Sequence, residues 1–104
     1  MAQVRLDFGS YLAERRYSAN LTQRGLADKC GVSPAYIAAL ERNTSEPPPL
    51  RTCKALARAL GVNLEEIWQH SFVARLKRWL KREGYSEISE SDLLDFAKKI
   101  KHRG

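Results

Sequence analysis

Residues 23–42 read QRGLADKCGVSPAYIAALER, and this stretch decides the fold. It predicts two short helices joined by a tight turn. Thr22 is placed to cap the first helix, and Gly31 ends it because glycine readily adopts the left-handed conformation that closes a helix. Ser33 and Pro34 begin the second helix, since serine is a good N-cap and proline at the first helical position loses no hydrogen bond.

The same stretch meets the packing conditions for a fixed angle between the two helices. Ala27 is small, which lets the second helix cross closely over it, and Val32, Ile37 and Leu40 supply apolar contacts. A short helix, a turn with glycine and a second short helix form the unit that places one helix in the major groove of DNA. The sequence therefore predicts a helix-turn-helix with residues 33–42 as its recognition helix.

Helical periodicity continues on both sides of this stretch, and no segment alternates between apolar and polar residues as a strand does. Asp7 can cap a helix that ends near Tyr17. Beyond the recognition helix, the consecutive prolines of residues 47–49 exclude a helix, so we expect an irregular loop there. The fold class is therefore predicted to be all-α.

The rest of the chain predicts four more helices. The first follows the prolines directly, and Asn63 with Glu66 supplies a capping pair for a short fifth helix. Two amphipathic helices follow, separated by Gly84, and we expect them to form a helical hairpin. This interpretation divides the chain into a five-helix domain at residues 1–70 and a hairpin at residues 71–104.

Composition and charge narrow the class of protein. Hydrophobic residues make up 43% and charged residues 29%, which is typical of a soluble globular protein. The sequence has no apolar run long enough for a membrane span and no pattern of a secretory signal, so we expect a cytoplasmic protein with no membrane partner. The net charge of +6 suits a protein that binds a polyanion, although residues 1–70 contribute only +2 and residues 71–104 contribute +4.

Catalytic and metal-binding patterns are not apparent in the sequence. Cys30 and Cys53 stand alone, and neither they nor the two histidines have the spacing of a zinc site. Both cysteines fall at apolar helical positions, so we expect buried, unpaired thiols. We find no glycine-rich phosphate loop and no carboxylate cluster with metal spacing. We therefore expect no cofactor, no metal and no enzymatic activity.

From about residue 8 to residue 68 the sequence resembles the Cro/C1 (XRE) family of repressors. The matching features are Leu21-Thr22-Gln23, Leu26-Ala27, Gly31-Val32-Ser33, Tyr36-Ile37, Leu40-Glu41-Arg42 and the segment ALARALGV at residues 55–62. The resemblance implies a lambda-repressor-like DNA-binding domain. It also implies that Gln23 contacts a DNA phosphate and that Arg16 pairs with Glu41 in an inner salt bridge.

In such proteins the exposed, N-terminal part of the recognition helix reads the bases. Here that part carries small side chains that offer no bidentate hydrogen bonds to base edges. We therefore expect limited direct readout, with specificity drawn partly from DNA shape or from paired half-sites. The predicted DNA-binding residues are Thr22, Gln23, Arg24, Ser33, Pro34, Ala35, Tyr36, Ala38, Ala39, Arg42 and Asn43.

A looser resemblance links the chain to SinR-type regulators. It rests on the long loop after Glu41 and on the C-terminal pattern of a tryptophan-bearing helix, a glycine turn and a second helix. The resemblance implies that the hairpin forms homodimers and binds a small antagonist protein.

Burial of apolar surface favours the same interpretation, because a two-helix hairpin has little interior of its own. A second copy would cover its apolar side chains, while the alternative is that the hairpin folds back on its own DNA-binding domain. We expect Arg75, Arg78 and Arg82 to form a solvated face. The predicted multimerisation residues are Phe72, Leu76, Trp79, Leu80, Leu93, Leu94, Phe96 and Ile100.

Together these features predict a transcriptional regulator that binds double-stranded DNA. We expect a repressor that binds paired half-sites as a homodimer. An antitoxin-type interaction protein, which neutralises a protein partner and autoregulates its operon, is an alternative because it would use the same fold. A bridging co-regulator is a third possibility, and it would show no salt-dependent binding to DNA.

Overall fold

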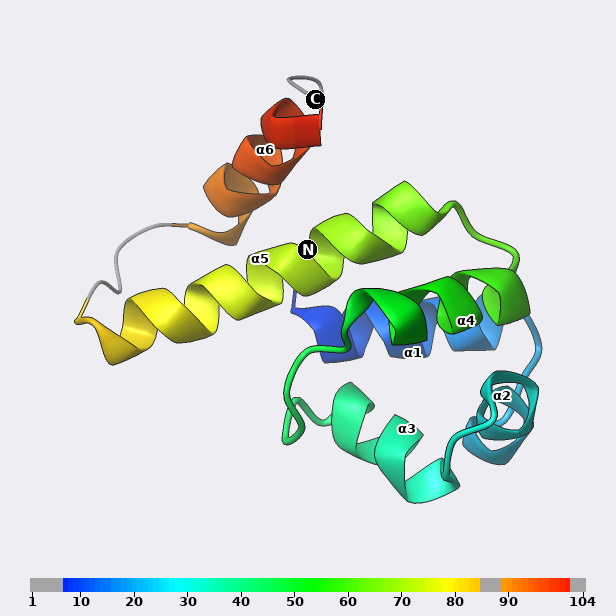
Figure 1. Ribbon diagram of the computed structural model, residues 1–104. Coiled ribbons are helices and arrows are strands. Elements are labelled where there is room, and N and C mark those ends of the chain that lie inside the picture. Colours follow the sequence, from blue (N-terminus) through cyan, green and yellow to red (C-terminus); the bar gives the residue numbers. More distant parts are fainter. Residues whose placement is uncertain (1–6, 85–88, 102–104) are drawn as a thin grey trace, which may run out of the picture.

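The computed structural model describes residues 7–84 and 89–101 (Figure 1). All regular structure in these two ranges is helical, which confirms the all-α class. The helices are α1 (Phe8–Ser18), α2 (Gln23–Cys30), α3 (Pro34–Glu41), α4 (Leu50–Leu60), α5 (Leu64–Arg82) and α6 (Glu90–Lys101). In this part of the chain, no helix is both long enough and apolar enough to cross a membrane.

The predicted helix ends in the first half of the chain are confirmed. The side-chain oxygens of Asp7, Thr22 and Ser33 each accept a hydrogen bond from the backbone amide three residues later, at 2.9 to 3.1 Å. Gly31 closes α2 in the left-handed conformation, with a φ of 70°. Local sequence therefore sets where α1, α2 and α3 begin.

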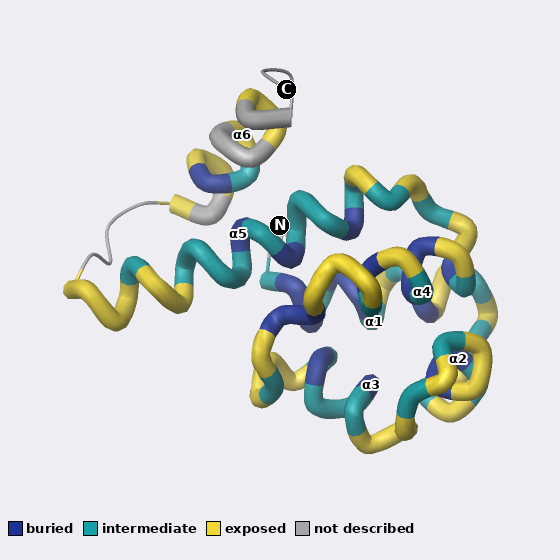
Figure 2. The backbone as a smooth tube through the Cα atoms, viewed as in Figure 1, coloured by how far each residue is buried: buried dark blue, intermediate teal, exposed yellow. Residues whose placement is uncertain are grey.

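Helices α1 to α4 and the start of α5 enclose one apolar core (Figure 2). Each helix contributes side chains from one face, as the 3.6-residue period requires. The most deeply buried of these are Leu12, Leu26, Ala27, Ile37, Cys53, Leu56 and Ile67. This core holds α2 and α3 against the rest of the domain.

Helix α5 corrects the prediction of two separate helices after residue 63. It is one continuous helix of 19 residues. Residues 68–72 contain neither glycine nor proline, so nothing in the backbone interrupts the helix there. The predicted boundary between residues 70 and 71 therefore falls inside one rigid element, and the division into two domains stays a prediction.

The predicted capping pair at the start of α5 is confirmed only in part. The side chain of Asn63 caps the helix by accepting a hydrogen bond from the Glu65 amide at 2.9 Å. The Glu66 carboxylate instead contacts α1, where it accepts a hydrogen bond from the Tyr11 hydroxyl at 2.6 Å and pairs with Arg15 at 2.7 Å. Glu66 therefore joins two helices rather than closing one.

Helix α6 packs against α5 and lies on the side of α5 away from α3 and α4 (Figure 1). Its start is capped as expected, since the Ser89 hydroxyl accepts a hydrogen bond from the Asp92 amide at 3.1 Å. Val73 and Leu93 form the buried centre of this contact, and the partly buried side chains around them are Phe72, Leu76, Leu80 and Leu94. Two predicted multimerisation side chains, Phe96 and Ile100, lie outside those that the structure describes.

The two cysteines are unpaired, as predicted. Cys53 is fully buried, which confirms the prediction for this thiol. Cys30 is only half-buried, so the prediction is confirmed in part there. Burial raises the pKa of both thiols, which keeps them protonated at neutral pH. They act as small apolar side chains in the packing of α2 and α4.

Candidate nucleic-acid interface

The angle between α2 and α3 is held by apolar contacts from the predicted residues. Ala27, Ile37 and Leu40 are buried, and Val32 packs against them from the turn. The turn itself is closed by a hydrogen bond from the Val32 amide to the Ala27 carbonyl oxygen at 3.1 Å. The predicted helix-turn-helix packing is therefore confirmed.

A close approach of two backbones fixes α3 against α1. Gly9 lies beside the last residues of α3, where a Cβ atom on it would stand 2.7 Å from the carbonyl carbon of Glu41 and 2.8 Å from the carbonyl oxygen of Leu40. Backbone atoms cannot move aside as a flexible side chain can. Only glycine fits this position without separating the two helices.

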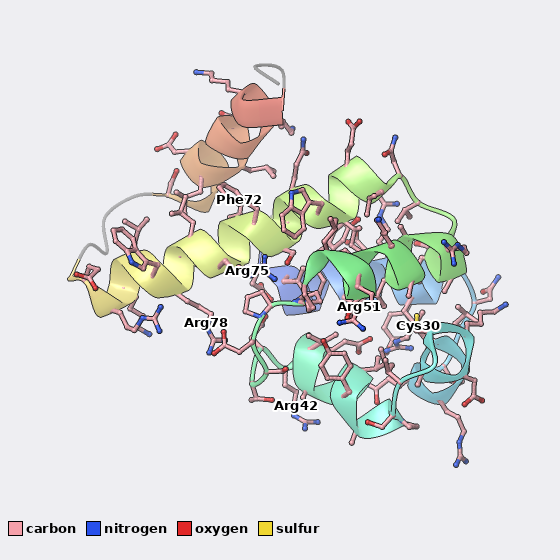
Figure 3. The ribbon with its side chains drawn as sticks, in the orientation of Figure 1. Cys30, Arg42, Arg51, Phe72, Arg75 and Arg78 are labelled. Carbon is pink, nitrogen blue, oxygen red and sulfur yellow. The ribbon has the colours of Figure 1, made fainter. Side chains whose placement is uncertain are left out.

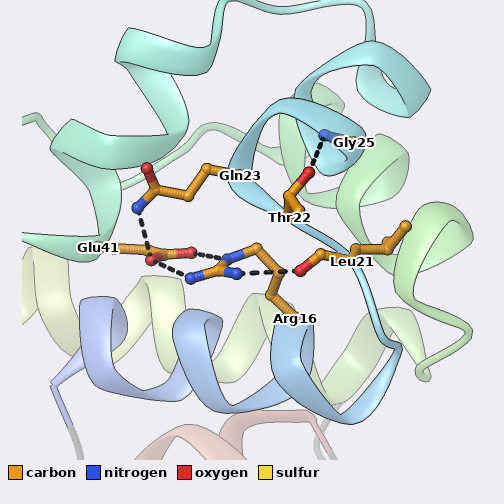
Figure 4. A network of polar contacts seen from close by, with 6 residues as sticks. All are labelled: Arg16, Leu21, Thr22, Gln23, Gly25 and Glu41. Carbon is orange, nitrogen blue, oxygen red and sulfur yellow. Dashed lines mark hydrogen bonds and ion pairs between the residues drawn. The ribbon is translucent and has the colours of Figure 1, made fainter.

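A buried polar network joins α1, α2 and α3 (Figure 4). The Arg16 Nε donates to Glu41 at 2.6 Å, and the two side chains are only 7% and 8% exposed. A second guanidinium nitrogen of Arg16 donates to the Leu21 carbonyl oxygen at 2.9 Å. The hydrogen bond to Glu41 raises the pKa of Arg16, so the guanidinium stays charged. The inner salt bridge implied by the family resemblance is thus present.

The same carboxylate orients Gln23 at the start of α2. The Gln23 Nε2 donates to Glu41 Oε1 at 2.9 Å (Figure 4). A side-chain amide carries two N–H groups, so this bond leaves one of them available to another acceptor. Gln23 is therefore held in place while it keeps a donor for an external group.

The outer flank of α3 is accessible along its length. None of the predicted DNA-binding residues is buried. Those classed as exposed are Thr22, Arg24, Ser33, Pro34, Ala35, Arg42 and Asn43, and those at intermediate exposure are Gln23, Tyr36, Ala38 and Ala39. The exposed start of α3 is visible in Figure 2.

Two of these predicted residues have structural contacts of their own. The Asn43 side-chain oxygen accepts a hydrogen bond from the Gly9 amide at 2.9 Å, and its nitrogen donates to Asp7 at 2.8 Å. Tyr36 is partly buried and packs against the core. Burial raises the pKa of the Tyr36 hydroxyl, which stays protonated. Both residues therefore fix the ends of α3 in place.

Arg51 is a cation beside the recognition helix that the sequence analysis did not single out. It is exposed in the first turn of α4 (Figure 3). The N-terminus of α4 has no side-chain cap and no acidic residue in its first turn. Free backbone amides and a nearby cation are the groups that bind phosphate at a helix N-terminus. The sequence feature that could have identified Arg51 is a basic residue in the first helical turn after the proline loop.

The prediction of a solvated face on the first hairpin helix is wrong for Arg75. Its guanidinium is half-buried and donates to the Pro48 carbonyl oxygen at 2.7 Å. Arg78 is exposed but donates to the Ser45 carbonyl oxygen at 3.1 Å, and Arg82 is exposed. The error follows from the expected break near residue 71, because a continuous α5 brings these side chains to the loop.

Comparisons with known proteins agree with this architecture. The helix-turn-helix family matches residues 12–67, which is more than half of the chain. Among curated proteins the chain has no significant match. A solved chain from a SinR protein/SinI protein complex is similar in fold, with a TM-score of 0.55 and 19% identity, covering 92% of this chain and 96% of that one. The chain belongs to the helix-turn-helix family of the Cro/C1 (XRE) type, whose members are DNA-binding regulators of transcription.

Proposed function

We propose that this protein is a repressor that binds specific sites in double-stranded DNA, with α3 in the major groove. The observation that carries the proposal is the two-sided character of α3. Ile37 and Leu40 are buried on its inner side, while Ser33, Pro34 and Ala35 are exposed on its outer side. A helix that is packed against the core on its inner side and exposed on its outer side can enter the major groove without rearrangement of the protein.

Contacts to the DNA backbone come from the elements around α3. Gln23 offers its second side-chain N–H to a phosphate, and Thr22 and Arg24 flank it at the start of α2. Arg42 at the end of α3 and Arg51 at the start of α4 supply positive charge on the other side. Such contacts set the position of α3 on the duplex and make binding sensitive to salt.

The side chains of α3 can make only a few types of contact with DNA bases. Its outer flank presents methyl groups from Ala35, Ala38 and Ala39 and one hydroxyl from Ser33. Methyl groups can contact the thymine methyl, and a serine hydroxyl can bond to a donor or an acceptor, but neither forms a bidentate pair. Specificity therefore depends partly on DNA shape and on the spacing of two half-sites.

The DNA-binding proposal is tested by selecting bound duplexes from a random pool and titrating the best one at several salt concentrations. Gln23→Ala should weaken binding to every sequence and leave the salt slope nearly unchanged, because the lost phosphate contact is made by an uncharged amide. Gln69→Ala, on α5, is the matched control and should change neither quantity. Equal binding by the Gln23 variant would remove it from the interface, and a parent protein without salt-dependent binding would overturn the proposal.

The hairpin is the proposed dimerisation surface. Only Val73 and Leu93 are buried in its described core, while Trp79 is 48% exposed. Burial of a large, half-exposed aromatic side chain against a second copy of the chain would be favourable, because it removes apolar surface from water. A dimer also spans two half-sites about one helical turn apart. The fold similarity to a chain from a two-protein complex supports a further protein partner, which we place at the same hairpin.

Sedimentation of the full chain tests the dimer. Trp79→Ser should weaken self-association at least tenfold, since buried aromatic side chains dominate interface energies. Tyr17→Ser is the matched control, because Tyr17 is 69% exposed on α1 and lies outside the hairpin. A parent protein that sediments as a monomer at high concentration would contradict the dimer. A reporter gene placed behind the selected site tests repression, which activation of the reporter would contradict.

A further inference from the structure

We infer that Arg75 is a positioning residue for DNA recognition, although it lies in the hairpin half of α5 (residues 71–82). It holds the loop that follows the recognition helix and so joins the hairpin to α3. This inference rests on the proposed function, because it concerns how α3 is presented to DNA. It assigns a role in DNA binding to a residue that has no contact with the proposed interface.

The Pro48 carbonyl oxygen is the centre of this connection. It accepts a hydrogen bond from the buried Ser71 hydroxyl at 2.7 Å and another from the Arg75 guanidinium at 2.7 Å. The same guanidinium nitrogen lies 3.3 Å from the Pro47 carbonyl oxygen. The Arg75 guanidinium also lies over the Trp68 ring, 5.3 Å from its centroid, which limits its freedom to move away.

A second arginine extends the connection by one helical turn. Arg78 donates from the same side of α5 to the Ser45 carbonyl oxygen at 3.1 Å (Figure 3). We call Ser71, Arg75 and Arg78 the loop clasp. The prolines of this loop lack amide hydrogens, so the loop offers its carbonyl oxygens to these donors.

The end of α3 does not pack tightly against α5. A groove of about 300 Å³ separates the end of α3 from α5, with Leu40 and Asn43 on one side and Val73 and Ala74 on the other. The loop begins on α3 itself, since the Thr44 amide donates to the Ala39 carbonyl oxygen at 3.0 Å. The clasp therefore bridges a gap between the recognition helix and the hairpin.

The consequence of losing Arg75 follows from burial. Pro47 and Pro48 are buried, so their carbonyl oxygens would lose a charged donor without access to bulk water. The loop would then be held by the Ser71 hydroxyl and the buried Pro48 side chain, and the spacing between the ends of α3 and α4 would be less firmly fixed. Phe72, three residues before Arg75 on α5, packs in the cluster between α5 and α6 (Figure 3), so a partner that moves the hairpin would act on the same connection.

The test uses the full chain and two readouts, amide hydrogen exchange without DNA and affinity for the selected duplex. Arg75→Met keeps most of the apolar stem but removes the donors. It should raise exchange in residues 39–50 at least tenfold, leave exchange in α1 unchanged, and weaken specific binding about tenfold with an unchanged salt slope. Arg75→Lys should restore part of both effects. Arg82→Met, a change of the same type at an exposed position on α5, should alter neither readout.

Each remaining outcome decides against the clasp or against the proposed function. Unchanged exchange in residues 39–50 would overturn the inference. A salt slope reduced by about 1 would also overturn it, because Arg75 would then contact a phosphate directly. A parent protein that binds no DNA would remove the proposed function, and exchange would still report whether Arg75 orders the loop.

Discussion

The helix-turn-helix region and the C-terminal hairpin are both helical, but they are stabilised in different ways. Helices α1 to α4 share a core with the start of α5, where many side chains are fully buried. The hairpin core has two buried residues in its described part, Val73 and Leu93, and Trp79 is left half-exposed. The first region has an interior of its own, whereas the second has apolar surface to offer to a partner.

The same difference appears in two arginine–glutamate pairs. Arg16 and Glu41, inside the first region, are 7% and 8% exposed and are 2.6 Å apart. Arg78 and Glu46, between the hairpin and the loop, are 45% and 81% exposed and are 3.4 Å apart. A buried charge depends on its partner, whereas an exposed charge is hydrated in any case.

The largest expected effect comes from breaking the buried pair. Glu41→Ala should lower the free energy of unfolding by about 3–5 kcal/mol, because it leaves the Arg16 charge buried without a partner. Glu46→Ala is the matched control in the exposed pair and should cost less than about 1 kcal/mol. Urea unfolding of both variants measures the difference. Equal losses would show that burial does not distinguish these two pairs.

A smaller effect should separate the two cores. Leu56→Ala should cost about 2–5 kcal/mol and loosen all of α1 to α4, since Leu56 is fully buried in their shared core. Leu93→Ala should cost less, because the small cluster around Val73 can close up. It should raise hydrogen exchange in α6 and leave α1 protected. Increased exchange in α1 as well would mean that the two regions unfold together.

The smallest effect concerns Asp7, which caps α1 and bonds to Asn43. Burial raises its pKa, but the hydrogen bonds from Asn43 and Ser10 lower it more, so the net pKa lies below the ordinary 3.8. A carboxyl group whose pKa is lowered by folding stabilises the fold fully when the pH is above its pKa in the unfolded chain. That stability is lost as the pH falls through its pKa in the folded protein. Asp7→Asn should cost less than about 1 kcal/mol at pH 7, and the difference in thermal midpoint should shrink below about pH 4. A constant difference across that range would contradict this assignment.

Local features of the first half of the chain were predictable because each one depends on a few neighbouring residues. Thr22 and Ser33 can cap a helix wherever the chain places them, and Gly31 can adopt a positive φ without strain. The apolar spacing of Ile37 and Leu40 likewise marks the inner side of α3 in any tertiary context. The family resemblance added the pairing of Arg16 with Glu41, which local rules do not supply.

Other features were missed because they depend on contacts between distant segments. Nothing in the sequence around Gly9 indicates its role, which is to let α1 meet the backbone of α3. The DNA contact of Asn43 stays a prediction, but the bridge that its amide makes to Asp7 and Gly9 was not foreseen. Arg75 looked solvated, because its spacing within the helix gives no sign of the loop 27 residues earlier in the chain.

The sequence by itself determined the helical class, the ends of α1 to α3, and the helix-turn-helix with its bare outer flank. These follow from periodicity and capping, which act over a few residues. Only the tertiary structure decided that Gly9 lets two backbones meet and that the proline loop is tied to the hairpin. The reason is physical: the Cys53 thiol, five residues along the chain, is a weak donor to the Pro48 carbonyl oxygen, and folding brings stronger donors from Ser71 and Arg75.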